Sequence, residues 1–301
     1  MTSTPRPTRA DLWQPRDPPP LAPGLHVVAT PIGNLRDITL RALDTLAAAD
    51  WVICEDTRLT GRLLMHFGLK RPLLPYHEHN AAEMRPRILA LLAEDKALAL
   101  VSDAGTPLVS DPGYKLVAEA ASAGHPLYTV PGPSSVTAAL AIAGLPTDRF
   151  HFTGFLSHKR AARRQSLVAL RAIPATLVIL EAPQRLAESL ADMAEILGPR
   201  PAAIARELTK IHEEVRRDSL PALAASYAAE GPPRGELVVL IGQGGADIEA
   251  PSPETIDTAL RGALRSGLAL KEAVTAIATL YELPRREVYA RGLALKEEGG
   301  R

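Results

Sequence analysis

From residue 25 to residue 144, short apolar runs alternate with segments of helical periodicity, and this alternation restricts the fold more than any other feature. Runs typical of strands occupy residues 25–29, 51–55, 98–103 and 126–132. Segments typical of helices occupy residues 38–50, 57–68, 84–96, 111–124 and 133–144. Strands that alternate with helices predict a parallel sheet with helices on both faces. We therefore expect an α/β domain over residues 24–146.

A second α/β domain is expected over residues 147–246, because the same patterns resume after the polar segment 145–150. Its expected strands are 175–182, 202–209, 213–220 and 235–242, and its expected helices are 161–172, 185–198 and 220–231. Helical periodicity returns over residues 254–297, so we expect a helical tail over residues 252–301. Residues 1–23 are rich in proline and polar groups, which predicts a disordered segment.

Composition narrows the class of protein. With 46% hydrophobic residues among 301, the chain can bury a substantial core, and its zero net charge argues against a uniformly basic nucleic-acid binder while leaving room for a local basic patch. The single cysteine, Cys54, excludes an intramolecular disulfide and a cysteine-based zinc site, and it fits a reducing compartment. No apolar stretch approaches the ~20 residues of a membrane helix, and we find no signal-peptide core. We expect a soluble, cytoplasmic protein without a membrane partner.

Three loops that follow predicted strands share an unusual composition of Gly, Pro and small or hydroxyl residues. They are Thr30–Leu35, Ser102–Pro107 and Pro131–Ser135. Ligands of open α/β sheets bind at the carboxyl ends of the strands, and rigid turns leave backbone groups free to contact them. One such loop would be ordinary loop composition, but three at one edge predict a ligand site. The loops lack the glycine fingerprint for dinucleotides and the Gly-Lys-Ser/Thr of a phosphate loop.

A fourth strand end carries Glu55 and Asp56. Asp56 could simply cap the next helix, whereas two adjacent carboxylates could also bind a cation or act as a base. His77 and His79 alternate along an extended segment and could chelate a metal, but without a third close ligand we favour a polar loop. We expect no metal site. Cys54 lies in an apolar strand and is expected in the core.

Basic residues gather at the start of the helix expected after residue 160: Lys159, Arg160, Arg163 and Arg164. A solvated helix face is the ordinary explanation for such a run. However, cations oppose the helix dipole at an N-terminus, so an RNA phosphate backbone would account for them better. The segment from Arg206 to Lys210, at another strand end, has the same two explanations.

Several motifs together resemble those of a known family. They are VVATPIGNLRDITLRAL, CEDTR, VSDAGTPLVSDPGY, PGPSSVTAAL, GLPTDRFHFTGFL and ARELTK. These motifs, between about Leu25 and Gly242, resemble the tetrapyrrole methylase superfamily, in its branch of bacterial small-subunit rRNA ribose methyltransferases. The resemblance implies two α/β domains with S-adenosylmethionine in the cleft between them, plus a C-terminal helical tail. A sulfonium cofactor without phosphate would explain why the loop at Pro31 needs no phosphate fingerprint.

The resemblance also implies roles for particular residues. It places the cofactor against Pro31, Ile32, Gly33, Asp103, Ala104, Gly105, Thr106, Ser134, Ser135, Leu180 and Glu181. The candidates for a general base are Glu55, Asp56 and Glu181. The implied reaction is 2′-O-methylation of a cytidine ribose in the decoding centre of 16S rRNA, by a homodimer that needs no metal. Two alternatives stay open: a methylase acting on a tetrapyrrole or precorrin, and a ribosome assembly factor without catalysis.

Overall fold

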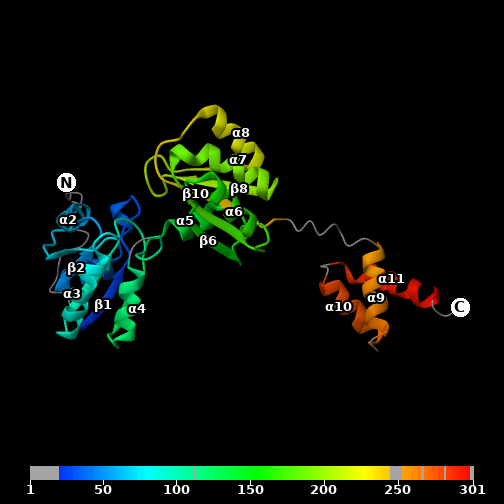
Figure 1. Cartoon of the computed structure of the whole chain (residues 1–301), viewed down its shortest axis with the longest axis horizontal. Helices are drawn as coiled ribbons and strands as arrows, with labels where there is room; N and C mark the ends of the chain where they lie inside the picture. Colours follow the sequence, from blue (N-terminus) through cyan, green and yellow to red (C-terminus); the bar gives the residue numbers. More distant parts are fainter. Residues whose placement is uncertain (1–19, 111–112, 245–252, 266–267, 281–282, 299–301) are drawn as a thin grey trace, which may run out of the picture. The chain divides into compact units, whose positions relative to one another are not determined.

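The computed structural model describes residues 20–110, 113–244, 253–265, 268–280 and 283–298 (Figure 1). The chain forms two compact units, one ending at Gln243 and one beginning at Gly244. The proline-rich segment 1–19 lies outside the described residues. So do residues 111–112, where we expected a helix to begin. Residues 20–23 belonged to the segment expected to be disordered, but Leu21 packs on the core and the Ala22 carbonyl lies 2.9 Å from Nε2 of His26.

The first sheet is parallel, as the alternation predicts. Its strands are β1 (Gly24–Val28), β2 (Trp51–Cys54), β3 (Leu73–Pro75), β4 (Ala97–Val101) and β5 (Leu127–Val130). The order is β3-β2-β4-β1-β5, which makes β1 and β4 direct neighbours. All five residues of β4 are buried, as is typical of a central strand covered on both faces.

Helices cover both faces of this sheet (Figure 1). They are α1 (Leu40–Ala48), α2 (Thr57–His66), α3 (Ala81–Ala93) and α4 (Tyr114–Ser122), with a short helix η2 (Leu35–Asp37) after β1. One apolar cluster joins β-strand residues to α3 and α4 through Ile88 and Leu116. The other joins the opposite strand residues to α1 and α2 through Leu46 and Leu64.

The second sheet has the order β6-β7-β10-β8-β9 and is mixed. Its strands are β6 (Phe150–Phe155), β7 (Thr176–Glu181), β8 (Pro201–Arg206), β9 (Glu214–Ser219) and β10 (Leu237–Ile241). Only β6 and β7 pair in parallel, and the other pairs are antiparallel. Its helices are α6 (Arg160–Leu170), α7 (Leu186–Leu197) and α8 (Leu220–Glu230), with a short helix η3 (Pro183–Arg185).

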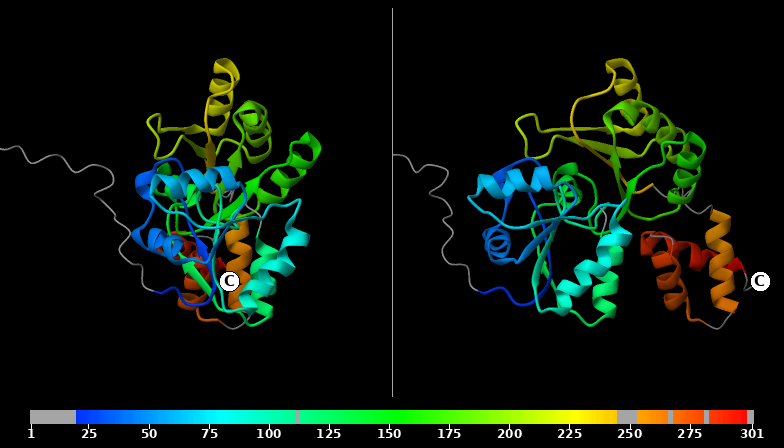
Figure 2. Two further views of the ribbon diagram at one scale, coloured as in Figure 1. Left: turned by 90° about the vertical axis from the view of Figure 1, so that its left-hand side faces the viewer. Right: turned by 60° about the vertical axis from the view of Figure 1, so that its left-hand side comes forward.

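Strand alternation divides the second sheet into two apolar faces. Leu177 and Ile179 belong to the cluster shared with α6, α7 and α8, whereas Val178 and Leu180 belong to the cluster shared with α5 (Ser135–Ala143). The same cluster includes Ile32 from the loop after β1. Helix α5 and the β1 loop therefore connect the first sheet to the second; Figure 2 shows this part of the chain from two further sides.

Two strands were missed in the sequence, β3 and β6. β3 has only three residues, and β6 begins at Phe150, the last residue of the segment that we read as a boundary. The helix expected over residues 133–144 is confirmed as α5. Gly144 follows it and adopts the left-handed conformation that often ends a helix.

The second unit consists, in its described residues, of α9 (Pro253–Arg265), α10 (Leu270–Leu280) and α11 (Arg285–Glu298). They bury a core of their own around Leu260, Val274, Ile277 and Val288. The described residues of the predicted tail thus form three helices, and residues 268–269 and 283–284 lie outside them. Among the described residues, no helix is both long and apolar enough to cross a membrane.

Candidate active site

The loops after β1, β4 and β5 lie together, as expected for the carboxyl edge of a parallel sheet. The backbone N–H of Thr30 donates to the Gly105 carbonyl at 2.8 Å, and the Gly105 N–H donates to the Thr30 carbonyl at 3.0 Å. The hydroxyl of Thr106 donates to the Pro133 carbonyl at 3.2 Å. These bonds join the three loops that the sequence singled out into one rigid group.

A cavity of about 690 Å³ opens beside two of these loops. Its lining includes five of the predicted cofactor residues: Pro31, Ile32, Gly33, Asp103 and Ala104. The other predicted cofactor residues do not line this cavity: Gly105, Thr106, Ser134, Ser135, Leu180 and Glu181. The structure adds a wall from α2, in which Leu59, Arg62, Leu63 and His66 follow helical spacing. The sequence showed α2 as a helix, but nothing in its pattern indicated which face would meet the loops.

Three carboxylates lie near the cavity: Asp103 lines it, whereas the candidate bases Glu55 and Asp56 are not part of its lining. Oδ1 of Asp103 accepts a hydrogen bond from the backbone N–H of Asp56 at 3.1 Å, which brings the β2 and β4 strand ends together. Burial and the nearby charge of Asp103 raise the pKa of Glu55 above its usual range, with His77 acting in the opposite direction. Glu55 therefore accepts a proton more readily than an ordinary glutamate does.

Asp56 is the N-cap of α2. Its Oδ1 accepts from the Arg58 N–H at 2.8 Å, and its Oδ2 pairs with the Arg58 guanidinium at 2.7 Å. The hydrogen bonds from Arg58 lower the pKa of Asp56 well below its usual range. Of the two explanations left open, the helix cap is thus the one the structure shows, and Asp56 is a poor proton acceptor.

Lys210, which the sequence left ambiguous, lies in this cavity wall. A Cβ on Gly33 would lie 2.5 Å from Cε of Lys210, so the lysine stem approaches a loop position that only glycine permits. Its Nζ pairs with Glu207 at 2.8 Å and with Glu236 at 3.1 Å. Glu207 and Thr209 have positive φ angles of 50° and 66°, an uncommon conformation for residues other than glycine. Such strain concentrates at functional sites.

Glu181 does not fit the predicted roles of general base and cofactor ligand. Its side chain is fully buried, and its carboxylate accepts from the Ser189 hydroxyl at 2.5 Å and pairs with Arg185 at 2.9 Å. Arg185 in turn donates to the Leu156 carbonyl at 2.7 Å. Because residues alternate along β7, Leu180 lies on the face that meets α5, and Glu181 points to the opposite face. Glu181 therefore holds the second sheet to η3 and α7.

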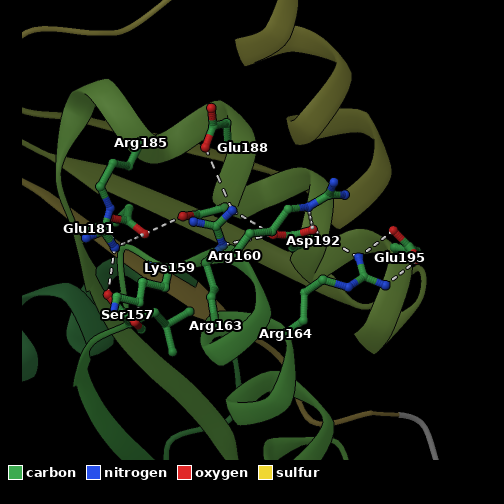
Figure 3. Close-up of polar contacts among 12 residues, drawn as sticks. Ser157, Lys159, Arg160, Arg163, Arg164, Glu181, Arg185, Glu188, Asp192 and Glu195 are labelled. Carbon is green, nitrogen blue, oxygen red and sulfur yellow. Dashed lines mark hydrogen bonds and ion pairs between the residues drawn. The ribbon is translucent and has the colours of Figure 1, made fainter.

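Arg163 does not fit the predicted role in RNA binding, because it is only 1% exposed. Figure 3 shows Arg160, Arg163 and Arg164 directed at Asp192 of α7, with Nη2 of Arg163 2.7 Å from Oδ2 of that carboxylate. Arg164 also pairs with Glu195 at 2.5 Å. We expected an RNA phosphate backbone to account for these cations at the start of α6, whereas in the structure the carboxylates of Asp192 and Glu195 in α7 pair with the three arginines. Arg160 and Lys159 keep exposed side chains, so their contact with RNA stays a prediction.

Cys54 is fully buried, and burial raises the pKa of its thiol to about 11. It is a core residue, as expected. His77 and His79 lie with ring centroids 6.0 Å apart. Within the described ranges, no group of three or more His, Cys, Asp or Glu residues could hold a metal ion.

The comparison with known proteins decides the family. The sequence model of the Tetrapyrrole (Corrin/Porphyrin) Methylases matches residues 24–224. The chain belongs to this tetrapyrrole methylase family. A second family model, described as the RsmI C-terminal HTH domain, matches residues 249–296, which covers the helical tail. Membership confirms the assignment made from the motifs, and it implies S-adenosylmethionine as the cofactor.

Two relatives that match over most of their length carry the same name. The chain is 51% identical over 282 residues to "Ribosomal RNA small subunit methyltransferase I" of Mesorhizobium japonicum, covering 93% of this chain and 95% of that protein. It is 41% identical to the protein of the same name from Escherichia coli O157:H7, covering 91% and 96%. Methyl transfer is thus the activity of this family branch.

Solved structures show the fold. Uroporphyrin-III-C-methyltransferase from Thermus thermophilus superposes with a TM-score of 0.51 at 26% identity, over 72% of this chain and 93% of that one. Diphthine synthase superposes with a TM-score of 0.57 at 20% identity, over 72% of this chain and 89% of that one. The predicted fold class of two α/β domains is confirmed.

Proposed function

We propose that this methyltransferase places a methyl group on the ribose 2′-oxygen of a cytidine in the decoding centre of 16S rRNA. The observation that carries the proposal is the 51% identity to a small-subunit rRNA methyltransferase over nearly the whole of both chains. The proposal includes a small ribosomal subunit as the substrate, a homodimer as the working form and the cytoplasm as the location.

The carboxylate of Asp103 in the cavity lining fits the cofactor. S-adenosylmethionine carries a sulfonium and an ammonium group, and it supplies an electrophilic methyl group when bound. Asp103 lines the cavity, so its carboxylate could accept hydrogen bonds from the cofactor's amino or ribose hydroxyl groups. Pro31 and Gly33 shape the adjacent loop, in which no phosphate-binding pattern is needed.

The chain's own residues then have two tasks in the transfer. They hold the ribose hydroxyl in line with the reacting carbon, since alignment alone reaches effective molarities of about 10⁵ M or more. They also accept the hydroxyl proton, which contributes roughly 10²–10⁴-fold. We assign proton acceptance to Glu55, because burial and Asp103 raise its pKa, whereas Asp56 is held by Arg58 and Glu181 is buried in its own network.

Methylation of assembled small subunits and of naked rRNA with labelled S-adenosylmethionine tests the proposal. A 2′-O-methyl group blocks alkaline cleavage of the neighbouring phosphodiester bond, so one protected position at a decoding-centre cytidine is the expected result. Label on a base, or binding to subunits without any transfer, would overturn the proposal, the second outcome in favour of an assembly factor. Transfer to uroporphyrinogen in place of RNA would favour the tetrapyrrole alternative.

A further inference from the structure

The wall that α2 contributes to the cavity combines exposed apolar groups with an unpaired cation. We propose that this wall, formed by Leu59, Arg62, Leu63, Met65 and His66 and called here the α2 rim, is the surface on which the target RNA strand docks. The inference rests on the proposed function, because it takes rRNA as the substrate. It places an RNA contact at the cavity that the candidate cofactor loops line, apart from the contact predicted for Lys159 and Arg160 at the start of α6.

The apolar part of the α2 rim is more exposed than a helix face of a folded domain requires. Leu59 is 42% exposed and Met65 is 72% exposed, whereas Thr60 and Leu64 of the same helix are buried. All of the rim residues line the cavity. Exposed apolar side chains gathered at a cavity mark a binding surface, and the face of an RNA base offers an apolar partner for them.

The positive charge of the α2 rim is free to bind an anion, unlike the charges of the other arginines described above. Arg62 is exposed, and among the described residues its guanidinium has no ion-pair partner; its Nε donates only to the Arg58 carbonyl at 3.4 Å. Arg58 on the same helix is paired with Asp56, and Arg163 and Arg164 are paired with carboxylates of α7. A free guanidinium is suited to a phosphate, which it can hold with two parallel hydrogen bonds.

The rest of the cavity lining is unsuitable for a polyanion. Asp103 and Glu236 line it, and the one lysine there, Lys210, is shared between two carboxylates. An RNA strand would be repelled by these carboxylates and attracted by the guanidinium of Arg62. The cationic groups of the cofactor have the opposite preference. The charge distribution therefore favours RNA at the α2 rim and the cofactor beside the carboxylates of the same cavity.

The test compares Arg62→Gln with the parent protein. The probes are small ribosomal subunits and a fluorescein-labelled fragment of small-subunit rRNA, titrated over a series of salt concentrations. Loss of one phosphate contact should weaken RNA binding about tenfold. It should also lower the salt slope by about 0.7–0.9. Affinity for S-adenosylmethionine, measured by calorimetry, should stay within about twofold because a rim contact to RNA does not touch the cofactor.

A matched control is Arg87→Gln on α3, an arginine that is equally exposed and lies on the other face of the first sheet. It should bind RNA like the parent protein.

A second variant, Met65→Ser, should weaken RNA binding without changing the salt slope, since it removes apolar contact but no charge.

The outcomes separate this inference from the proposed function. If the parent methylates rRNA and Arg62→Gln matches it in affinity and slope, the α2 rim is not the docking surface and the proposed function stands. If Arg62→Gln loses cofactor affinity to the same extent as RNA affinity, the rim belongs to the cofactor site and the inference fails. A parent that binds no RNA overturns both.

Discussion

Arg163 of α6 and Asp192 of α7 form an ion pair in which the side chains are 2% and 1% exposed and Nη2 lies 2.7 Å from Oδ2. The pair joins two helices on one face of the second sheet (Figure 3). Burying two charges costs desolvation free energy. Once both are buried, removing one leaves the other without its partner, which destabilises the folded state. Arg163, which we expected to bind RNA, therefore stabilises the packing of α6 against α7.

Arg163→Met should destabilise the protein by about 1.5–3 kcal/mol, because the buried Asp192 carboxylate loses its Arg163 donor and keeps only Arg160 and Arg164. Denaturant unfolding at pH 7 measures this free energy. Arg171→Met is the matched control, since Arg171 ends the same helix on an exposed surface and should change stability by less than about 0.5 kcal/mol. Equal stability of both variants would show that the pair contributes nothing.

Asp192 should also make stability depend on pH. Burial acts to raise its pKa, but hydrogen bonds from Arg163, Arg164 and Arg160 outweigh burial and lower the pKa. A lowered pKa in the folded state contributes stability that is present above the unfolded value of about 3.9 and is lost as pH falls below it. The difference in unfolding free energy between the parent and Asp192→Asn should therefore be large at pH 7 and shrink below pH 4. A difference that grows on acidification would contradict this assignment.

Asp103→Ala should weaken binding of S-adenosylmethionine by about 1.5–3 kcal/mol, the range for a hydrogen bond to a charged group. Calorimetry gives the affinity directly. Asp103→Asn keeps an acceptor oxygen for the Asp56 N–H, so it separates the charge from the hydrogen bond that holds the two loops together. An alanine variant that is folded and binds the cofactor normally would exclude Asp103 from the site.

Glu55→Gln should reduce the rate of methyl transfer by roughly 10²–10⁴-fold while leaving RNA and cofactor binding unchanged. The parent should lose activity on acidification at a pH above the usual range of a glutamate, because the pKa of Glu55 is raised and only the ionised carboxylate accepts a proton. Single-turnover rates across pH measure both effects. If Glu55→Gln keeps the parent's rate and acid limb, another group removes the proton.

Cys54 should be inert in the folded protein. Burial raises the pKa of its thiol to about 11, against a smaller opposing effect of the hydrogen bond to Thr60. The thiolate is the reactive form, so a thiol reagent at pH 8 should label the protein only after unfolding in guanidinium chloride. Rapid labelling of the native protein would mean that β2 opens in solution.

Much of the first sheet and its site followed from local pattern. Continuous apolar runs separated by helical segments require parallel strands, and parallel strands place the loops at Thr30, Ser102 and Pro131 on one edge. The bonds between Thr30 and Gly105 and between Thr106 and Pro133 confirm that these loops meet. The family could be identified for the same reason, since its motifs lie in these loops.

The pairing of charges could not be predicted in this way. Arg62 and Arg163 are both arginines on amphipathic helices, and no local pattern separates them. Arg163 is neutralised by Asp192, 29 residues away, because α6 and α7 pack on the same face of the second sheet. Arg62 stays free because α2 presents it to a cavity instead of to another helix.

The sequence by itself determined the helices and all strands except β3 and β6, the edge at which the loops gather and the family, because these depend on the order of residues along each segment. Only the tertiary structure decided which charges are paired, that Glu181 points away from the α5 face while Leu180 meets it, and that Lys210 lies against Gly33. Those outcomes depend on contacts between segments distant in the chain, whose energies no local pattern contains.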